Sequence, residues 1–168
     1  RTLSFKKNQL ENLDNFEGKK IDTLSLTQNR FRELPYQFLS KFPKLQTLYL
    51  DCNFLTTFSK QMANSIITLS LSLNCLQTIE VATLNLPQLM FLTLSKNQIR
   101  RLPNNFSKSF ANLKNLDLSD NFITEIPDDE SFFPKTLTDL NLANNMIEKV
   151  TKSITSLPNL SLLDITNN

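Results

Sequence analysis

The sequence predicts an α/β fold, a solenoid in which each repeated unit adds one strand to a parallel β-sheet and one loop or short helical turn to the opposite side. The first observation is an asparagine that recurs every 21 to 24 residues along the whole chain. The second is the apolar pattern before it, as in Leu92-Thr-Leu94-Ser-Lys-Asn97. A repeat of this length indicates a stacked solenoid, because no unit can bury its apolar face alone. The eight asparagines are Asn8, Asn29, Asn53, Asn74, Asn97, Asn121, Asn145 and Asn168.

The apolar positions predict the strand. Each unit follows the pattern Leu-x-x-Leu-x-Leu-x-x-Asn-x-Leu-x-x-Leu, in which apolar and polar residues alternate before the asparagine. Alternation of period two is typical of a short strand with one buried face. Successive strands must run parallel, since every unit repeats in the same direction, and they stack about 4.8 Å apart. We therefore expect columns of leucines inside the coil.

The recurring asparagine is predicted to satisfy backbone groups that the strand leaves unpaired where the chain turns. Its side chain carries both an acceptor and two N–H donors on a short stem, so it can bond the backbone of its own turn and of the next one. Aspartate lacks the donors and leucine lacks both groups. This residue is interpreted as structural.

The opposite side of the coil is predicted from the second half of each unit. Two units of 24 residues carry two phenylalanines four residues apart, a spacing that favours one helical turn begun by the preceding proline, with both rings pressed inward. These pairs are Phe38 with Phe42 and Phe106 with Phe110. The 21-residue units, which end at Lys20 and Ser65, are expected to cross this side in tighter loops.

The repeated pattern resembles the leucine-rich-repeat family over the whole chain, from Leu3 to Asn168. The resemblance implies a horseshoe-shaped arc with a concave parallel sheet, loops or short helical turns on the convex side, and a role in protein recognition. The 23-residue Leu-Pro-x-x-Ile units resemble cytoplasmic signalling members, and the 24-residue units with phenylalanine resemble extracellular receptors such as the Toll-like class. Phe38 and Phe106 stand one place earlier than in that receptor pattern.

The unbroken period leaves no room for a linker, so residues 1–168 are expected to form a single domain of about eight repeats, the first and last incomplete. Because both ends stop inside a repeat, we interpret the chain as part of a longer protein. No apolar run approaches the roughly 18 residues that would span a bilayer, so no direct membrane insertion is expected.

The two cysteines, Cys52 and Cys75, are expected to be free thiols. Their positions in adjacent units put their Cα atoms roughly 8 Å apart, beyond the reach of a disulfide bond. Free thiols slightly favour a cytoplasmic over an extracellular location. Two glycosylation-type triplets, which begin at Asn105 and Asn159, are no more than chance provides in a chain so rich in asparagine and serine.

The composition argues against an enzyme. The chain has no histidine, which removes the commonest general base, and the single glycine, Gly18, excludes the glycine-rich nucleotide-binding loops. No cofactor and no metal site are expected. The acidic run Asp128–Glu130 is interpreted as a solvated loop, because no turn glycine organises it for calcium.

The charge distribution argues against nucleic acid as a partner. A continuous basic stripe with stacking platforms is absent from the sequence. From Asn115 onward, nine acidic residues face only Lys135, Lys149 and Lys152.

The candidate binding residues are those predicted to point outward from the sheet. Near the middle of the chain, Tyr49, Phe54, Leu73 and Phe91 occupy outward positions where serine or threonine stands in several other units. Exposed aromatic residues on one face are common interface anchors. The alternative is that these rings cover one another and the end of the stack.

Four aspartates extend the candidate surface toward the C-terminus: Asp117, Asp120, Asp139 and Asp164. Asp117, Asn141 and Asp164 are predicted to share one column, where repeated negative charge would steer a basic partner. Solubility is the alternative explanation. The expected partner is a protein ligand with an apolar centre and a basic end, and the oligomeric state is left open.

Two functions follow from the sequence. The first is a non-catalytic protein-protein interaction module within a larger signalling or scaffolding protein. The second is an ectodomain segment of a Toll-like or other receptor that recognises an extracellular or microbial ligand.

Overall fold

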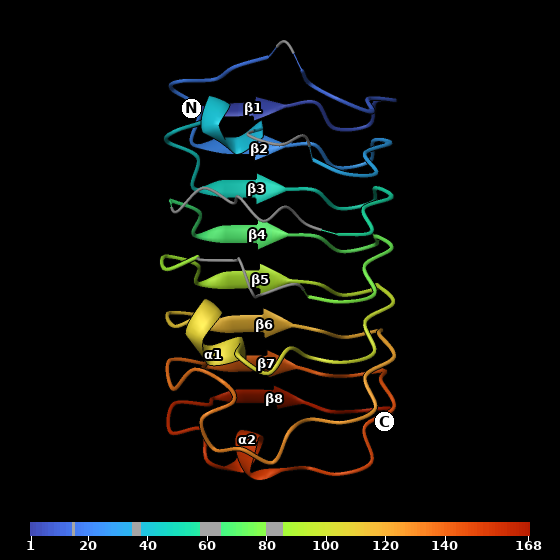
Figure 1. The fold of residues 1–168 in the computed structure, drawn as a ribbon, viewed down its shortest axis with the longest axis vertical. Helices are drawn as coiled ribbons and strands as arrows, with labels where there is room; N and C mark the ends of the chain where they lie inside the picture. The colour runs from blue at the N-terminus through green and yellow to red at the C-terminus, as the bar shows by residue number, and fades with distance from the viewer. Residues whose placement is uncertain (15, 35–37, 58–64, 80–85) are drawn as a thin grey trace.

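The structure is a computed structural model that describes residues 1–14, 16–34, 38–57, 65–79 and 86–168. Eight three-residue strands form one parallel sheet in the order β1 to β8, each strand pairing with the next along the chain (Figure 1). The predicted fold class is therefore confirmed. The strands are β1 (Thr2–Ser4), β2 (Thr23–Ser25), β3 (Thr47–Tyr49), β4 (Thr68–Ser70), β5 (Phe91–Thr93), β6 (Asn115–Asp117), β7 (Asp139–Asn141) and β8 (Leu162–Asp164).

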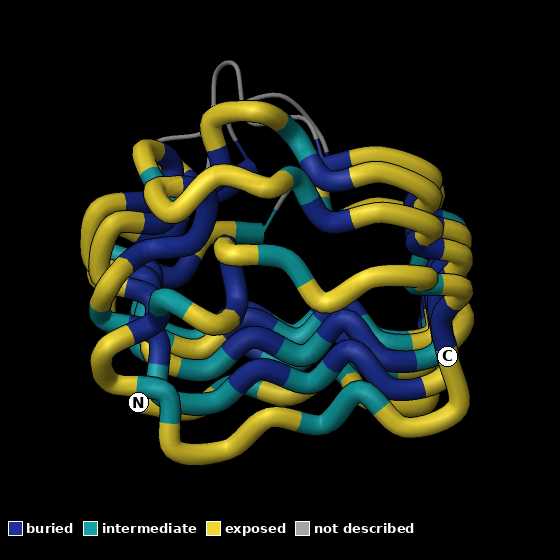
Figure 2. Tube along the Cα trace, turned by 90° about the horizontal axis from the view of Figure 1, so that it is seen from below, coloured by how far each residue is buried: buried dark blue, intermediate teal, exposed yellow. Residues whose placement is uncertain are grey.

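The register of the sheet places equivalent residues of every unit in columns. Leu48 of β3 pairs with Leu24 and Leu69 on its two neighbours, and all three side chains are fully buried. The first and third residues of each strand point to the other face. Figure 2, viewed along the stack, shows the strands on one side of the coil and the exposed loops on the opposite side.

The recurring asparagine closes the turn after each strand, as predicted. Asn97 shows the pattern: its Oδ1 accepts a hydrogen bond from the Leu76 amide at 3.0 Å, and its Nδ2 donates to the carbonyls of Leu71 at 2.9 Å and Leu94 at 3.0 Å. Leu94 belongs to its own turn, whereas Leu71 and Leu76 belong to the preceding unit. The asparagine is predicted to bond the turn of the following unit. That prediction is wrong, because its partners outside its own turn belong to the preceding unit.

The residue before each asparagine adopts a left-handed backbone conformation, with φ between 54° and 60° in all eight units. This conformation is costly for most residues with a β-carbon. It turns the chain so that the asparagine side chain enters the core. The eight residues are Lys7, Gln28, Cys52, Leu73, Lys96, Asp120, Asn144 and Asn167.

Among the described residues, the side opposite the sheet carries three single helical turns: η1 (Phe38–Lys41), α1 (Phe106–Ser109) and α2 (Lys152–Thr155). The predicted phenylalanine pairs pack inward, with ring centroids 5.2 Å apart for Phe38 and Phe42 and 4.8 Å apart for Phe106 and Phe110. All four rings are buried.

The predicted role of proline at the start of the helical turn is wrong for α1. Asn105 is the N-cap of α1, so Pro103 lies two residues further upstream. For η1 the corresponding Pro35 lies outside the described residues, as does most of the loop before Ser65 that was expected to be tight. Cys52 and Cys75 are both free, as predicted. No helix in the described part of the chain is both long and apolar enough to cross a bilayer.

Candidate functional site

The candidate site begins with the outward residues of the sheet, here called the sheet face: the first and third residue of each strand and the left-handed residue before each asparagine. Most of these side chains in the first half of the chain are small and polar, as in Thr23, Ser25, Thr47 and Ser70. Large or charged side chains on this face therefore stand out from their columns.

The four predicted apolar residues are all exposed. The exposed fraction is 38% for Tyr49, 53% for Phe54, 49% for Leu73 and 41% for Phe91. Tyr49 is the third residue of β3 and Phe91 the first residue of β5, so they lie in different columns with β4 between them. Leu73 lies in the left-handed turn after β4, and Phe54 follows Asn53 beyond the end of the sheet.

These aromatic side chains do not cover one another. The ring pairs found among the described residues include neither Tyr49, Phe54 nor Phe91. Leu73 is exposed although its backbone conformation suits asparagine or glycine better than leucine. A strained and exposed apolar side chain gives no benefit to folding that we can identify, which favours a role in contact with another molecule.

A shallow apolar cavity of about 320 Å³ lies at the edge where the strands begin, lined in part by Met90, the residue before Phe91. Sequence reasoning missed it. The signal was present, because Ile67 and Met90 stand directly before β4 and β5 where other units carry polar residues such as Gln46 and Thr138. The lining residues are Ile67, Pro87, Gln88, Met90, Asn112, Lys114 and Thr136.

The predicted acidic column exists. Asp117 pairs with Asn141 and Asn141 with Asp164 across β6, β7 and β8. Both aspartates are half-buried and accept local hydrogen bonds. Asp117 accepts bonds from the amide and hydroxyl of Ser119, and Asp164 accepts bonds from the amide and hydroxyl of Thr166.

These local bonds give the aspartates a structural role that sequence reasoning missed. The Asp-x-Ser and Asp-x-Thr spacing is the signal that could have found it. The hydrogen bonds from the Thr166 amide and hydroxyl lower the pKa of Asp164 below its ordinary value. Asp164 therefore stays charged at neutral pH, and its stabilising effect is lost only as the pH falls through that lowered pKa.

The other two predicted aspartates also accept hydrogen bonds, Asp139 from its neighbour in the sequence and Asp120 from the next unit. Asp139 accepts a hydrogen bond from the Thr138 hydroxyl at 2.6 Å. Asp120 accepts one from Asn144 Nδ2 at 3.1 Å, and Asn144 in turn accepts one from Asn167 Nδ2 at 2.9 Å. The three left-handed residues thus form a side-chain ladder along the edge of the sheet, which keeps the Asp120 carboxylate on the surface near Asp117.

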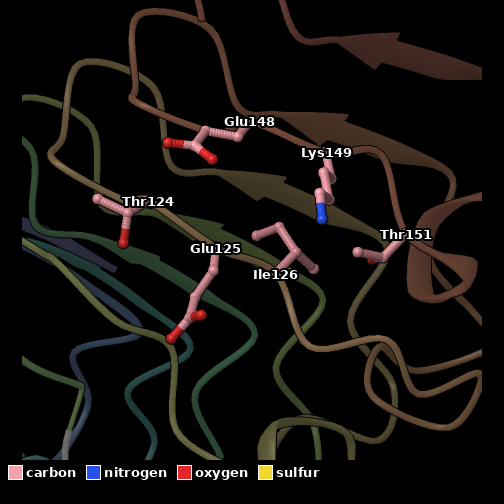
Figure 3. A pocket seen from close by; sticks show the side chains of 6 residues that line it. All are labelled: Thr124, Glu125, Ile126, Glu148, Lys149 and Thr151. Atoms are coloured by element: carbon pink, nitrogen blue, oxygen red, sulfur yellow. The ribbon is translucent and has the colours of Figure 1, made fainter.

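A second surface, here called the asparagine edge, is formed by the residues that directly follow the asparagines. Phe122 is 41% exposed and Met146 is 55% exposed, and they directly follow the recurring asparagines Asn121 and Asn145. Between the same two units lies a cavity of about 380 Å³, shown in Figure 3. It is lined by Thr124, Glu125, Ile126, Glu148, Lys149 and Thr151.

No metal-binding cluster accompanies these surfaces in the described residues. No group of three or more cysteine, aspartate or glutamate side chains is placed to hold a metal ion there. In the acidic run, Asp129 accepts hydrogen bonds from the amide and hydroxyl of Ser131, which lower its pKa. Asp128, Asp129 and Glu130 are all exposed.

Comparisons with known proteins agree with this architecture. Residues 111–168 match the family model described as Leucine rich repeat. The mouse leucine-rich repeat serine/threonine-protein kinase 1 is 30% identical over 133 residues, covering 64% of this chain and 7% of that protein. The human leucine-rich repeats and immunoglobulin-like domains protein 3 is 33% identical over 92 residues, covering 51% of this chain and 8% of that protein.

Among solved structures, the TLR13–ssRNA13 complex superposes with a TM-score of 0.86 and 25% sequence identity, covering 98% of this chain and 24% of the other. The chain thus spans less than a tenth of the two curated relatives and about a quarter of that receptor chain. The repeat pattern, the family match over residues 111–168 and the shared fold lead to one conclusion: the chain is a solenoid with the leucine-rich-repeat fold.

Proposed function

We propose that this chain is a non-catalytic recognition module that binds a protein ligand on its sheet face. The observation that carries the proposal is a group of exposed apolar side chains, Tyr49, Leu73 and Phe91 on the sheet face and Phe54 just beyond its end, in the half of the chain where most sheet-face residues are small and polar. Large apolar side chains in the centre of a surface supply most of the free energy of protein association. The apolar cavity lined in part by Met90 adds a recess for a partner side chain.

The acidic half of the sheet face adds selectivity for a basic partner. Asp117, Asp120, Asp139 and Asp164 hold their carboxylates at fixed positions through hydrogen bonds. Charges fixed in advance cost less to order on binding, so they favour fast and selective association. The proposed ligand therefore has an apolar centre and a basic end, and it lies lengthwise across β3 to β8.

We propose further that the chain is a single domain within a larger signalling or scaffolding protein. The match to a small part of a much longer kinase is consistent with this arrangement. The alternative is an ectodomain segment of a Toll-like or related receptor, which the similarity to the TLR13–ssRNA13 complex favours. The sequence that flanks this chain in its gene distinguishes them: an attached signalling domain supports the first, and a signal peptide with cysteine-rich caps supports the second.

The similarity to a receptor solved with RNA also raises nucleic acid as a ligand. The aspartates at β6, β7 and β8 would repel a phosphate backbone that followed the sheet face. A protein ligand is therefore the better fit to this chain.

The test is affinity capture with the immobilised protein and with a triple variant, Tyr49→Ala, Leu73→Ala and Phe91→Ala. We expect the variant to lose the captured partner while its circular dichroism stays unchanged, because all three side chains are exposed. A matched triple variant on exposed polar residues outside the sheet face, Thr56→Ala, Gln77→Ala and Thr78→Ala, should capture normally. Equal capture by all three proteins would show that the sheet face is not the binding surface.

A further inference from the structure

We propose that the asparagine edge around Phe122 and Met146 is a second docking surface, which binds an arginine-containing apolar segment of a protein partner. One arginine side chain of that segment enters the cavity between the carboxylates of Glu125 and Glu148. Phe54 also lies on this edge, but three units away from Phe122, and the residues proposed here include none of the sheet face, so the inference is independent of the function proposed for the sheet face.

The apolar part of this surface is built by strand-like alternation after the asparagine. Ile123 points into the core and is fully buried, so Phe122 and Thr124 on either side of it point outward together. Met146 and Glu148 repeat this arrangement in the next unit. In most other units the position of Phe122 and Met146 holds a polar or charged residue, such as Gln9, Arg30 or Gln98.

The Phe122 ring already attracts a guanidinium group. The guanidinium carbon of Arg100 lies 5.9 Å from the centroid of this ring. A cation over an aromatic face is held by the electrostatic field of the ring. Arg100 thus already supplies the cation over this ring, so the segment is expected to place its apolar side chains against Phe122 and Met146 and its arginine in the neighbouring cavity.

The cavity next to these residues suits the arginine side chain. Glu125 and Glu148 line it from neighbouring units, and neither forms an ion pair within the described residues. Figure 3 shows both carboxylates at the cavity and the Lys149 side chain extending toward Ile126. Ile126 supplies an apolar contact for the methylene groups of an incoming arginine. A planar guanidinium can bond two carboxylates at once, which an ammonium group does less well.

The charge around the cavity favours a basic occupant. The two carboxylates outweigh the single ammonium of Lys149, and the whole segment from Asn115 onward carries nine acidic residues against three lysines. Lys149 lines the same cavity, so its positive charge opposes a cationic ligand. Removing the charge of Lys149 should therefore strengthen the binding of a cationic ligand.

The probe is a fluorescently labelled peptide of alternating leucine and arginine, titrated with the protein at physiological salt and followed by fluorescence anisotropy. We expect Glu125→Gln combined with Glu148→Gln to weaken binding at least tenfold. Lys149→Gln should strengthen it severalfold. A peptide with citrulline in place of arginine keeps the shape but not the charge, and it should bind at least tenfold more weakly to the unaltered protein.

The chain offers a matched control. Glu33 has the same position in its unit as Glu125, and Glu11 the same position as Glu148, but both lie several units away. Glu11→Gln combined with Glu33→Gln removes the same charge and should leave the affinity unchanged. The proposal is overturned if the control pair weakens binding equally, if Lys149→Gln weakens it, or if the arginine peptide binds no better than the citrulline peptide.

Discussion

At the scale of single residues, two neighbouring positions in each unit have opposite requirements. The asparagine must be an asparagine, because its Oδ1 accepts a bond from the preceding unit while its Nδ2 donates to two or three carbonyls. The residue before it needs only to tolerate a positive φ, and the chain places lysine, glutamine, cysteine, leucine, aspartate and asparagine there. The first position is therefore constrained by its hydrogen bonds, and the second is open to functional change.

Replacing one of the buried recurring asparagines by aspartate tests the requirement for an asparagine at this position. Asn97→Asp removes the two N–H donors and leaves the carbonyls of Leu71 and Leu94 unpaired in the core. We expect a loss of about 1–3 kcal/mol in the free energy of unfolding, measured by urea denaturation. Asn8→Asp is the matched control, because Asn8 is exposed and water can replace its bonds. Equal losses at the two positions would contradict the role assigned to the buried amide.

The second requirement separates stability from recognition at Leu73. Leu73→Asn places a residue that tolerates the left-handed conformation at φ 55°, so the free energy of unfolding should rise by about 0.5–1 kcal/mol. The same change removes an exposed apolar side chain from the sheet face and should weaken partner capture. Gln28→Asn, at φ 57° in the turn after β2 and outside the β3 to β8 stretch proposed for the ligand, should also stabilise the protein, but without an effect on capture. A Leu73→Asn protein that is more stable and captures normally would remove Leu73 from the binding surface.

At the scale of the repeated elements, phenylalanine rings stabilise the side of the coil opposite the sheet, and the number of ring contacts differs between units. Phe106 contacts Phe110, Phe132 and Phe133, which joins α1 to the loop of the following unit. Near the N-terminus, Phe42 contacts Phe38 and Phe16. Gly18 packs against the same Phe42 ring, and its amide donates to the Lys41 carbonyl at 3.0 Å.

A β-carbon at Gly18 would disturb this packing. It would lie 2.7 Å from Ile21 Cγ1 and 2.8 Å from two atoms of the Phe42 ring, which is too close for either side chain to stay in place. We expect Gly18→Ala to cost about 1–3 kcal/mol in thermal or chemical denaturation. In the background Phe42→Leu the ring is gone, so the same substitution should cost clearly less. An unchanged cost would mean that the backbone of Gly18, and not the space beside it, matters.

The strands and the hydrogen bonds of the recurring asparagines could be predicted from the sequence, because they depend on contacts that recur at every unit. Leu48, Leu69 and Asn97 are positioned by a pattern that the chain repeats eight times. The start of α1 at Phe106 and the cavity between Glu125 and Glu148 occur in only one or a few units. They depend on how loops of different sequence pack side by side, and no repeated pattern signals that packing.

At the scale of the whole molecule, the sheet face changes character along its length, from apolar and small polar residues at β3 to β5 to mainly acidic residues at β6 to β8, where the exposed Leu162 is the exception. Asn141 shows how the acidic half can be neutralised without disturbing the fold, since its Oδ1 already accepts the bond from the Ala143 amide that an aspartate would accept. The free energy of unfolding of the triple variant Asp117→Asn, Asp139→Asn and Asp164→Asn should therefore differ from that of the unaltered protein by less than about 1 kcal/mol.

The same triple variant should associate more slowly with the captured partner. Measured at low salt by surface plasmon resonance, the association rate should fall by about tenfold, with a smaller change in the dissociation rate. Raising the ionic strength should slow the unaltered protein more than the variant. An association rate that is equal for both proteins at all salt concentrations would show that the aspartates serve the fold alone.

The strands β1 to β8 pair in the order of the sequence. The distance between the apolar half and the acidic half of the sheet face is therefore set by the number of strands between them. Inserting or deleting one whole unit between β5 and β6 would change that distance by one strand spacing of about 4.8 Å and leave each half intact. Duplication of a unit is thus a simple genetic route to a partner of different length. The distance between the apolar side chains and the acidic side chains can therefore change only in steps of one whole repeat unit.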